Sequence, residues 1–599
     1  MREPRVRLQQ ETLVTRVVNK RSGKKIFIDP DCPDIATALR GPEAEEWRAA
    51  CMKELKQQLE MHTWTVVKKS EIPKGTRCIK SGWLLKKKYV RGKVSKYKSR
   101  MFAKGYSMRK GVDYQETYAA TPRAASFRLL VSTAVEHGME MFSADVSVAF
   151  LHCQLPKQLY METFPFAQEL MPELFQDKDT RLALAKSIYG LKNSSMLFGK
   201  MMEKALKDLG FEQSENDKCV FMRAKDKSGK LLPGYDINEN RKDVDVVALC
   251  TYVDDLGGFA SSKQVWDDTI TELGSVFKIK NEGRLDTFIG IECNHHDDGS
   301  ISLSHKSKIE KIVAACEGKL PARTSSTPLP EGTLFPKVPD DAPPMSAEDQ
   351  ALVDSVDYRS IVGALLHITV MVRADIAFGL SQLCRHVTNP RAEHVRALLH
   401  MVSYLRATKD HGPKYTRGTE RKVHVYVDAS FAECVDTRRS TSGWVVMVNG
   451  CAVAWSSKRQ ATVSLSSTES ELEALRQALA EVIALKADLA LLDPMLARSK
   501  WIVHEDNNAA RLIVEGGGSV CARKHICVKA HWLREVWMNG LFELVYVNTA
   551  DQTADTLTKS LSGPLVEKHR DAMFNVHGSG RARRCTLVQD WLRFTVAEK

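Results

Sequence analysis

Residues 421–562 alternate strand-like and helix-like patterns in an order that restricts the fold more than any other feature of the chain. Val423–Asp428 (VHVYVD) alternates apolar and polar residues, as a half-buried strand does. Trp444–Trp455 (WVVMVNGCAVAW) is typical of two strands joined at Asn449-Gly450, because both residues tolerate the positive φ of a type I′ turn. These residues therefore predict three sequential strands.

The next patterns predict helices packed on that sheet. Ser466 and Glu469 are spaced as a capping box, and the helix they precede carries apolar residues on one face: Leu472, Leu475, Leu479 and Val482. Further elements follow in the order Trp501–Glu505 (strand), a helix beginning at Asn507 or Asn508, Ala530–Met538 (helix), FELVYV (strand) and TADTLTK (short helix). The order βββαβα, one further helix and then βα predicts a mixed sheet covered by helices.

Four carboxylates in this region are expected at one edge of the sheet, each from a different element: Asp428, Glu471, Asp506 and Asp555. Clustered acids repel one another, and two Mg²⁺ ions, which prefer oxygen ligands, would keep them ionised. A pair of metal ions supports phosphodiester cleavage. Any one of these acids alone is more simply explained as a helix cap, whereas four in this order favour a metal site.

The front half holds a second acidic set. Val244–Ala260 reads as two apolar strands with Asp254-Asp255 at the bend, and Asp145 lies in an apolar strand that runs into a helix. An isolated Asp-Asp turn is more often solvated. Tyr252-Val253 before the pair, together with an upstream strand aspartate, favours a site for a cation.

A basic segment precedes this set. Lys86–Lys110 carries eleven Lys or Arg residues and no acid, with four interleaved aromatic residues: Tyr89, Tyr97, Phe102 and Tyr106. The whole chain has a net charge of +13, which favours a polyanionic partner, nucleic acid before membrane. A charge run is usually a solvated face, but this one is also typical of a hairpin that holds phosphates.

A proline-rich connector divides the chain. Seven of the 21 prolines fall in residues 321–344, where proline fixes φ and removes backbone donors. A helix is expected from Glu43, with Trp47, Cys51, Leu55 and Leu59 at spacings of four, and helices resume at Tyr358–Cys384 and Ala392–Leu405.

Cysteine and hydropathy patterns indicate the cellular compartment of the chain. The fourteen cysteines include no Cys-x-x-Cys pair, which indicates a reducing compartment rather than a disulfide scaffold. No stretch is long and apolar enough to span a bilayer, and the first residues lack the apolar core of a secretory signal. A soluble intracellular protein is expected.

These motifs occur together in one family. From about Trp47 to Leu561 the chain resembles the reverse transcriptase and ribonuclease H part of copia-type retrotransposon Pol polyproteins. The resemblance rests on these blocks in their family order: EWRAACMKELKQQLEMHTW, KSRMFAKGYSMRKGVDYQETYAA, SADVSVAFLHCQL, KSIYGLKNS, GFEQSENDKCVF, YVDD, YRSIVGALLHI, RADIAF, DTRRSTSGWV, SLSSTESELEAL, RKHICVKAHWLRE and QTADTLTK.

The resemblance implies roles for the matching residues. The polymerase carboxylates would be Asp145, Asp254 and Asp255. Nucleotide-site residues would be Arg100 and Lys104 at the triphosphate, Phe150 as the residue that excludes a ribose 2′-OH, Tyr252, and Asn193, which stands where the family usually has Gln. The ribonuclease H tetrad would be Asp428, Glu471, Asp506 and Asp555, with Glu469 as a competitor for Glu471.

The resemblance also implies a fold class, α/β (α+β), with a right-hand polymerase followed by a ribonuclease H-like mixed sheet. The expected divisions are a polar tail (1–42), fingers and palm (43–300), a thumb or connection (301–420) with the linker (321–344), the ribonuclease H-like domain (421–562) and a basic tail (563–599).

The resemblance also implies the cofactors and partners of the chain. Each active site would bind two Mg²⁺ ions, with Mn²⁺ as a substitute. The substrates would be an RNA template, a DNA primer, dNTPs and RNA–DNA hybrid, and the family implies an element capsid and integrase as partners, with no membrane. The expected location is a cytoplasmic virus-like particle, with possible nuclear entry.

Three alternatives stay open. A catalytically silent, nucleic-acid-binding relic is favoured by Asn193, because the shorter amide would position dNTP less well. An integrase-like recombinase shares the ribonuclease fold but has no place for YVDD. A zinc site at Cys521, His525, Cys527 and His531 has unsuitable spacing.

Overall fold

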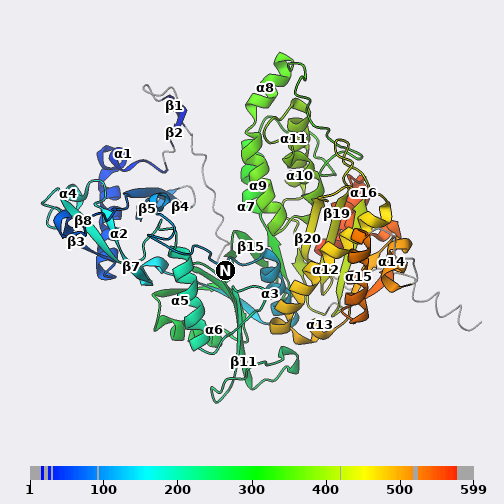
Figure 1. Cartoon of the computed structure of the whole chain (residues 1–599), viewed down its shortest axis with the longest axis horizontal. Coiled ribbons are helices and arrows are strands. Elements are labelled where there is room, and N and C mark those ends of the chain that lie inside the picture. Colours follow the sequence, from blue (N-terminus) through cyan, green and yellow to red (C-terminus); the bar gives the residue numbers. More distant parts are fainter. Residues whose placement is uncertain are drawn as a thin grey trace, which may run out of the picture. The chain divides into compact units, whose positions relative to one another are not determined.

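A computed structural model describes residues 15–18, 25–28, 31–90, 93–418, 420–516 and 524–576 (Figure 1). The chain forms two compact units. The first contains Met1–Thr121, Asp145–Leu209 and Ile270–Lys280, and the second contains Pro122–Ala144, Gly210–Thr269 and Asn281–Lys599. The linear divisions expected from the sequence stay predictions, because each unit is assembled from separate stretches of chain.

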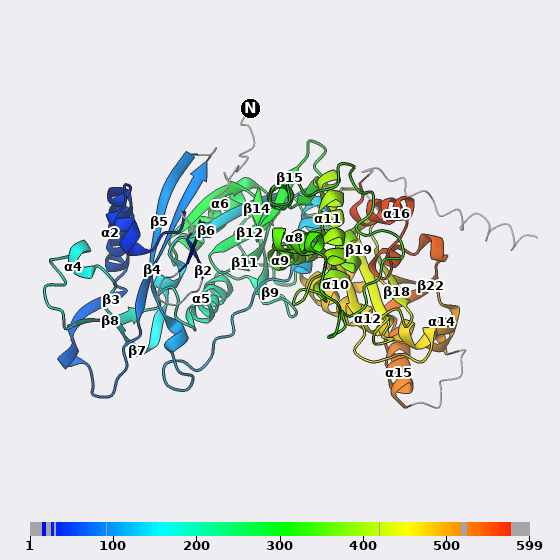
Figure 2. The ribbon, with the colours of Figure 1, turned by 90° about the horizontal axis from the view of Figure 1, so that it is seen from above.

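The first unit is built on a three-stranded antiparallel sheet and a long hairpin. The sheet order is β3 (Trp64–Lys68), β8 (Thr180–Lys186) and β7 (Gln154–Glu162). The basic segment forms the hairpin β4 (Ser81–Val90) and β5 (Lys93–Ala103), whose strands lie side by side in Figure 2. The unit also contains β1 (Thr15–Val18), β2 (Lys25–Ile28), α4 (Ala167–Leu170), α5 (Ser194–Asp208) and the 3₁₀ turns η1 (Lys69–Glu71), η2 (Gly105–Ser107) and η3 (Ala149–His152).

The helix predicted from Glu43 is confirmed as α2 (Ala44–Glu60), and its predicted apolar residues Trp47, Cys51 and Leu55 are fully buried. The expected polar tail also contains structure. A short helix, α1 (Ile35–Arg40), begins at Asp34, whose carboxylate accepts hydrogen bonds from two backbone N–H groups, and it buries Ala38 and Leu39.

The second unit contains a six-stranded sheet. Its order is β13 (Ile279–Arg284), β6 (Glu140–Val146), β12 (Asp255–Ala260), β11 (Val244–Tyr252), β10 (Val220–Asp226) and β9 (Glu212–Gln213). Within β6 and β13 the chain crosses the boundary between the units. Three helical elements accompany these strands: α3 (Ala124–Glu136), which is buried along most of its length, α6 (Lys263–Gly274) and η4 (Ile237–Glu239).

A second group of elements follows in the same unit. The strands β14 (Thr287–Phe288), β15 (Ile291–His295), β16 (Ile301–Ser304) and β17 (Lys414–Tyr415) form a sheet. The helices are α7 (Lys306–Ala315), α8 (Ala347–Ser355), α9 (Tyr358–Met371), η5 (Ala374–Ile376), α10 (Ala377–Cys384) and α11 (Ala392–Ala407). Residues 321–344 have neither helix nor strand, as expected, yet Leu329 and Phe335 are buried, so the connector is held against the core.

Residues 423–574 complete the unit with a five-stranded mixed sheet in the order β20 (Cys451–Arg459), β19 (Thr441–Val448), β18 (Val423–Ser430), β21 (Trp501–Glu505) and β22 (Phe542–Tyr546). The first three strands are antiparallel, whereas β18, β21 and β22 run parallel. The accompanying elements are α12 (Ser467–Leu492), α13 (Pro494–Arg498), α14 (Asn508–Glu515), α15 (Lys524–Met538), η6 (Thr549–Asp551), η7 (Thr553–Leu557) and α16 (Gly563–Phe574). The predicted order of strands and helices is confirmed, with α13 as an unpredicted addition, and the hairpin turn has both Asn449 and Gly450 at positive φ. The tail expected from residue 563 instead begins with α16, whose apolar residues Val566, Met573 and Phe574 are buried.

The long helix α12 packs on this sheet through the predicted apolar face and also contacts α3 and β10 (Figure 1). On that second side, Asp488 is fully buried. Its carboxylate accepts hydrogen bonds from the Ser126 and Ser214 hydroxyls, at 2.9 and 2.6 Å, and from the Asn216 amide at 2.9 Å. Among the described residues, none of the helices combines the length and apolar character that a bilayer crossing requires.

Candidate functional site

The predicted ribonuclease acids lie on four elements of the second unit. Asp428 is on the central strand β18, Glu471 is in the second turn of α12, Asp506 follows β21 directly, and Asp555 is in η7. Asp428, Glu471 and Asp506 each place a carboxylate oxygen within 4.8 Å of the others. Three residues separated widely in sequence thus form one acidic cluster.

The cluster has the electrostatics of a cation site. Glu471 is buried, and burial together with the charges of Glu505, Asp428 and Asp506 raises its pKa well above the usual range. The Glu471 Oε2 atom is buried and has no hydrogen-bond partner. Burial and the Asp428 charge also raise the pKa of Asp506, whose Oδ2 accepts a hydrogen bond from the Thr549 hydroxyl at 2.9 Å. Hard divalent cations with oxygen ligands fit this donor set, because they would satisfy the orphaned oxygen and offset the repulsion.

Asp555 reaches the cluster through a close contact of η7 with the sheet. Gly443 pairs with Asp428 across β19 and β18, and a Cβ at Gly443 would lie 2.6 Å from Thr558 Cγ2. The missing side chain therefore lets η7 pack here. Burial and the Asp428 charge raise the pKa of Asp555 to about 7. The Lys559 ammonium lies 2.9 Å from Asp555 Oδ1 and 3.5 Å from Asp428 Oδ2.

The structure separates Glu471 from its competitor Glu469. Ser466 caps α12 by accepting the Glu469 N–H at 3.2 Å, as predicted. The Glu469 carboxylate accepts a hydrogen bond from the Leu465 N–H at 2.8 Å. Glu469 therefore serves the start of the helix, and Glu471 belongs to the acidic cluster.

Glu505, a fifth acid of this site, was not predicted. It is fully buried at the end of β21, and burial with the Asp506 and Asp428 charges raises its pKa well above the usual range. Its Oε1 accepts the Asn507 N–H at 3.0 Å and its Oε2 has no partner. The available signal was the adjacent Glu-Asp pair, but alternation along a strand predicts that such neighbours face opposite sides.

The three acids predicted for a polymerase site occupy the elements expected from the sequence. Asp254 is in the two-residue turn between β11 and β12, and Asp255 is the exposed first residue of β12. Val253, the other turn residue, has φ 53°, a conformation that is strained for a β-branched side chain. Asp145 is half-buried near the end of β6, in the first unit. The grouping of these three acids at one metal site stays a prediction.

Two predicted nucleotide-site residues of the first unit, Arg100 and Phe150, contact the ring of Tyr189. The Arg100 guanidinium lies 4.4 Å from the centre of the Tyr189 ring, and Phe150 meets the same ring edge-on at 5.3 Å. The half-buried Lys104 follows β5, four residues after Arg100. Tyr252 is exposed in the other unit. A cation and two aromatic rings in contact form a surface suited to a nucleotide.

Asn193 is buried just before α5 and does not cap that helix, and its Oδ1 has no hydrogen-bond partner. The loop before α5 also lies close to the end of β5, where the Ala103 N–H donates to the Tyr189 carbonyl at 2.8 Å. Two glycines permit this contact: a Cβ on Gly105 would lie 2.1 Å from the Gly190 oxygen, and a Cβ on Gly190 would lie 2.1 Å from the Ala103 oxygen.

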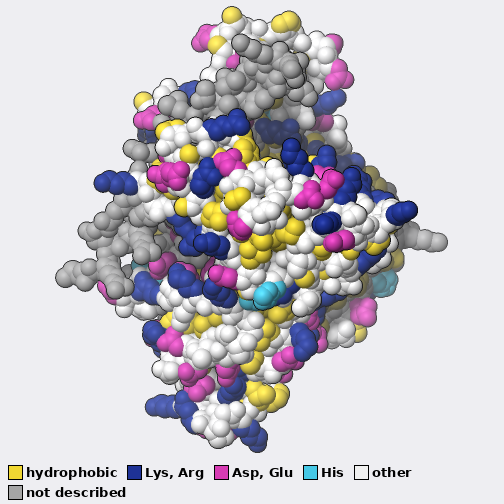
Figure 3. All heavy atoms as spheres, turned by 90° about the vertical axis from the view of Figure 1, so that its left-hand side faces the viewer, with side chains coloured by type: hydrophobic (Ala, Val, Ile, Leu, Met, Phe, Trp, Pro, Cys, Tyr) yellow, Lys and Arg dark blue, Asp and Glu magenta, His cyan; other side chains and the backbone are white. Residues whose placement is uncertain are grey.

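The basic segment forms the expected hairpin with several exposed lysines, including Lys86, Lys88, Lys93 and Lys96. Lys87 is instead paired with Glu43 at 2.7 Å. On the face drawn in Figure 3, Lys and Arg side chains (dark blue) are interspersed with Asp and Glu (magenta). Exposed lysines thus flank a paired one in β4.

The zinc alternative gains no support from the described residues. His531 is exposed on α15. Cys521 lies outside the described residues, and so do the side chains of His525 and Cys527.

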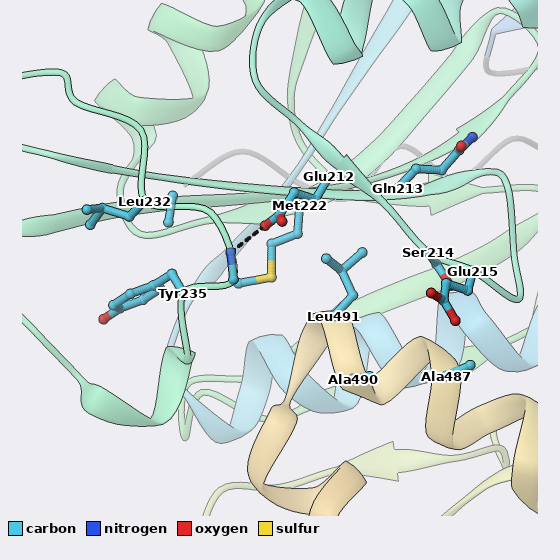
Figure 4. A pocket seen from close by; sticks show the side chains of 12 residues that line it. Glu212, Gln213, Ser214, Glu215, Met222, Leu232, Tyr235, Ala487, Ala490 and Leu491 are labelled. Atoms are coloured by element: carbon cyan, nitrogen blue, oxygen red, sulfur yellow. Dashed lines mark hydrogen bonds between the residues drawn. The ribbon is translucent and has the colours of Figure 1, made fainter.

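A cavity of about 280 Å³ in the second unit lies away from the acids (Figure 4). Its lining includes Leu232 and Tyr235 on one side and Leu491 of α12 on the other. Glu212 accepts the Gly234 N–H at its rim, at 2.8 Å. Sixteen residues separate Glu471 from Ala487 of the lining, roughly 24 Å along the helix. The cavity is therefore not part of the acidic cluster.

The chain is similar to several known proteins. Residues 61–329 match the family model described as reverse transcriptase (RNA-dependent DNA polymerase). The chain is 30% identical over 532 residues to the retrovirus-related Pol polyprotein from transposon RE1 of Arabidopsis thaliana, covering 88% of this chain and 33% of that protein. It is 28% identical over 536 residues to the Pol polyprotein from transposon TNT 1-94 of Nicotiana tabacum, covering 89% and 38%. A solved structure of the foamy viral protease-reverse transcriptase in complex with dsDNA is similar at a TM-score of 0.46, with 13% identity over 91% of this chain and 88% of that chain.

The chain thus contains a segment that matches the reverse transcriptase family, followed by a mixed sheet on which three acids cluster. Residues 61–329 match the reverse transcriptase family, and most of the chain is similar to copia-type retrotransposon Pol polyproteins, as the sequence motifs predicted. It spans about a third of the length of these curated relatives.

Proposed function

We propose that the chain is an RNA-directed and DNA-directed DNA polymerase with a linked ribonuclease H. The observation that carries the proposal is the convergence of Asp428, Glu471 and Asp506 within 4.8 Å, in a chain whose front half matches the reverse transcriptase family. The buried, unpartnered oxygen of Glu471 supports a cation there.

In the ribonuclease site, Asp428, Glu471, Asp506 and Asp555 would hold two Mg²⁺ ions, or Mn²⁺ in their place. Such a pair activates water and stabilises the leaving oxygen in phosphodiester hydrolysis. The chain's own contribution is to hold the carboxylates on a rigid strand, a helix and the packed η7 turn, so that little reorganisation is needed during the reaction. The substrate would be the RNA strand of an RNA–DNA hybrid, recognised through its shape and 2′-hydroxyls.

In the polymerase site, Asp145, Asp254 and Asp255 would hold the ions that accompany the incoming nucleotide. Arg100 and Lys104 would bind the triphosphate. Phe150, fixed against the Tyr189 ring at 5.3 Å, would limit space at the ribose 2′ position and so favour dNTPs. The primer 3′-OH would be extended along an RNA or DNA template.

The test is Mg²⁺-dependent dTTP incorporation on oligo(dT)-primed poly(rA) by the full chain, beside hybrid cleavage. We expect Asp254→Asn to abolish incorporation and spare cleavage, and Asp428→Asn to do the reverse. Incorporation that persists in the Asp254→Asn protein would contradict the polymerase assignment.

The second candidate is a silent nucleic-acid-binding relic, and the observation that favours it is Asn193 with its unpartnered buried amide oxygen. A folded wild type that binds hybrid without incorporating dTTP would favour the relic. Recovery of incorporation by Asn193→Gln would identify the shortened amide as the cause. The polymerase proposal also includes association with an element capsid and integrase, in a cytoplasmic particle with nuclear entry. This association is tested by co-purification.

A further inference from the structure

One cation of the protein already lies within the ribonuclease cluster. Lys559 follows Asp555 by four residues, and its N–H donates to the Asp555 carbonyl at 3.0 Å. That turn directs the ammonium back to the acids, 2.9 Å from Asp555 Oδ1 and 3.5 Å from Asp428 Oδ2. The Thr558 hydroxyl also donates to the Asp428 Oδ2 atom. Asp428 and Asp555 are therefore joined by one positive charge.

The acids on the opposite side of Asp428, Glu471 and Asp506, have a different electrostatic environment. Glu471 and Asp506 form no ion pair with a basic side chain in the described part of the chain, although both lie within 4.8 Å of Asp428 at their nearest ligand atoms. Glu471 Oε2 has no partner at all. The site consequently has two cation positions that share Asp428: one formed by Asp428, Glu471 and Asp506, and one between Asp428 and Asp555 that holds Lys559.

We propose that Lys559 occupies the position of the second divalent cation, between Asp428 and Asp555, and leaves it when that cation binds. The inference rests on the proposed ribonuclease function. Mg²⁺ requires oxygen ligands at about 2.0–2.1 Å, so it does not share these oxygens with an ammonium at hydrogen-bond distance. Two positive charges about 4 Å apart also repel each other.

The lysine has a route out of the site. Its side chain is 38% exposed, whereas those of Asp428 and Asp555 are 3% and 9% exposed. The flexible stem allows the ammonium to move into solvent while the carboxylates and the core stay in place. Lys559 thus stabilises the metal-free site and competes with the second ion, so the two ions bind with unequal affinity.

The experiment is a Mn²⁺ titration of the full chain followed by electron paramagnetic resonance at pH 8. All proteins carry Asp145→Asn, Asp254→Asn and Asp255→Asn, so that ions bound at the polymerase acids do not contribute. We expect two ions with dissociation constants at least tenfold apart. Lys559→Met, which keeps the length of the side chain without its charge, should tighten the weaker ion at least tenfold. Lys559→Arg, which keeps the charge, should change it less than threefold.

A weaker ion whose affinity is unchanged or reduced in Lys559→Met would overturn the proposal. Lys559→Gln serves as a second neutral variant if the methionine protein does not fold. In chelator, both neutral variants should melt below the wild type, and Mn²⁺ should remove the difference.

Glu471→Gln separates this inference from the proposed function. Loss of one ion in Glu471→Gln, with no effect of the Lys559 variants, overturns the role of Lys559 alone. No ion bound in any protein overturns both.

Discussion

Glu469 and Glu471 show how two glutamates separated by one residue acquire different roles. Successive residues of an α-helix are 100° apart, so residues two positions apart point in clearly different directions. Glu469 satisfies the Leu465 N–H at the start of α12, whereas Glu471 points into the acidic cluster. Their surroundings, and not their chemistry, distinguish them.

Glu471→Gln should reduce hybrid cleavage roughly 100-fold or more, comparable to the larger effects seen when metal sites lose a supporting group. In chelator it should raise the melting temperature, because a neutral amide avoids the free-energy cost of protonating a carboxyl that burial and neighbouring acids keep from ionising. Glu469→Gln is the matched control, with an expected cost of about 1 kcal/mol in stability and nearly full cleavage. Both are measured by hybrid cleavage and thermal unfolding. Equal loss of cleavage in the two variants would contradict the assignment.

The pH dependence of the metal-free protein follows from the same acids. Burial and mutual repulsion raise the pKa values of Glu471, Glu505, Asp506 and Asp555, the last to about 7. Folded protein therefore holds protons that the unfolded chain has released, and each such proton costs about 1.4 kcal/mol per pH unit as pH rises. The stability linked to these protons is complete below the unfolded pKa values near pH 4 and falls as pH rises through the folded values, which for Asp555 is about 7.

We expect the melting temperature in chelator to fall from pH 5 to pH 8 relative to protein with Mg²⁺. Glu505→Gln should reduce the slope of that difference, because it removes one of the protons involved. Parallel curves with and without Mg²⁺ would show that the acids do not hold the ion.

At the scale of elements, the end of β5 and the loop at Gly190 are joined by a backbone contact that admits no side chain. The Ala103 N–H to Tyr189 carbonyl bond keeps Tyr189 between Arg100 and Phe150. The interleaved basic and aromatic residues of the segment predicted the hairpin that contains β5. The contact with a loop nearly ninety positions later depends on tertiary packing, and no local pattern reports it.

Gly190→Ala should displace this loop and reduce dTTP incorporation more than tenfold while hybrid cleavage stays near wild type. Its Cβ would lie 2.1 Å from the Ala103 oxygen, and its φ of 87° disfavours any other residue. Gly199→Ala is the control, since Gly199 is exposed in α5 with no atom within 4 Å of the added carbon. It should keep incorporation and add about 0.5–1 kcal/mol of stability. Similar incorporation by both variants would contradict the role of the loop.

At the scale of the whole molecule, the second unit joins the six-stranded sheet to the ribonuclease H-like sheet through α12. One face of this helix packs on β18, and Asp488 on another face binds Ser126, Ser214 and Asn216. A fully buried carboxylate with several donors is costly to disrupt, because each donor would lose its partner.

Asp488→Ala should therefore destabilise the second unit by about 3–5 kcal/mol. We expect this unit to unfold in one calorimetric transition in the wild type and in two in the variant. Glu481→Gln is the control, since Glu481 also lies on α12 but pairs with the partly exposed Arg123 at the start of α3. It should cost about 1 kcal/mol or less. An unchanged single transition in Asp488→Ala would show that other contacts join the sheets.

The sequence by itself determined the order of the main strands and helices in residues 423–559 and the Asn449-Gly450 turn, and it predicted four acids for one edge of the sheet, of which Asp428, Glu471 and Asp506 converge. These features depend on local periodicity, turn chemistry and recognisable motifs, which are written in neighbouring residues. Tertiary structure alone decided that Glu505 is buried beside Asp506, that Lys559 reaches Asp428, and that Asp488 joins two sheets. Burial and charge pairing depend on residues distant in the chain, so only the folded molecule specifies them.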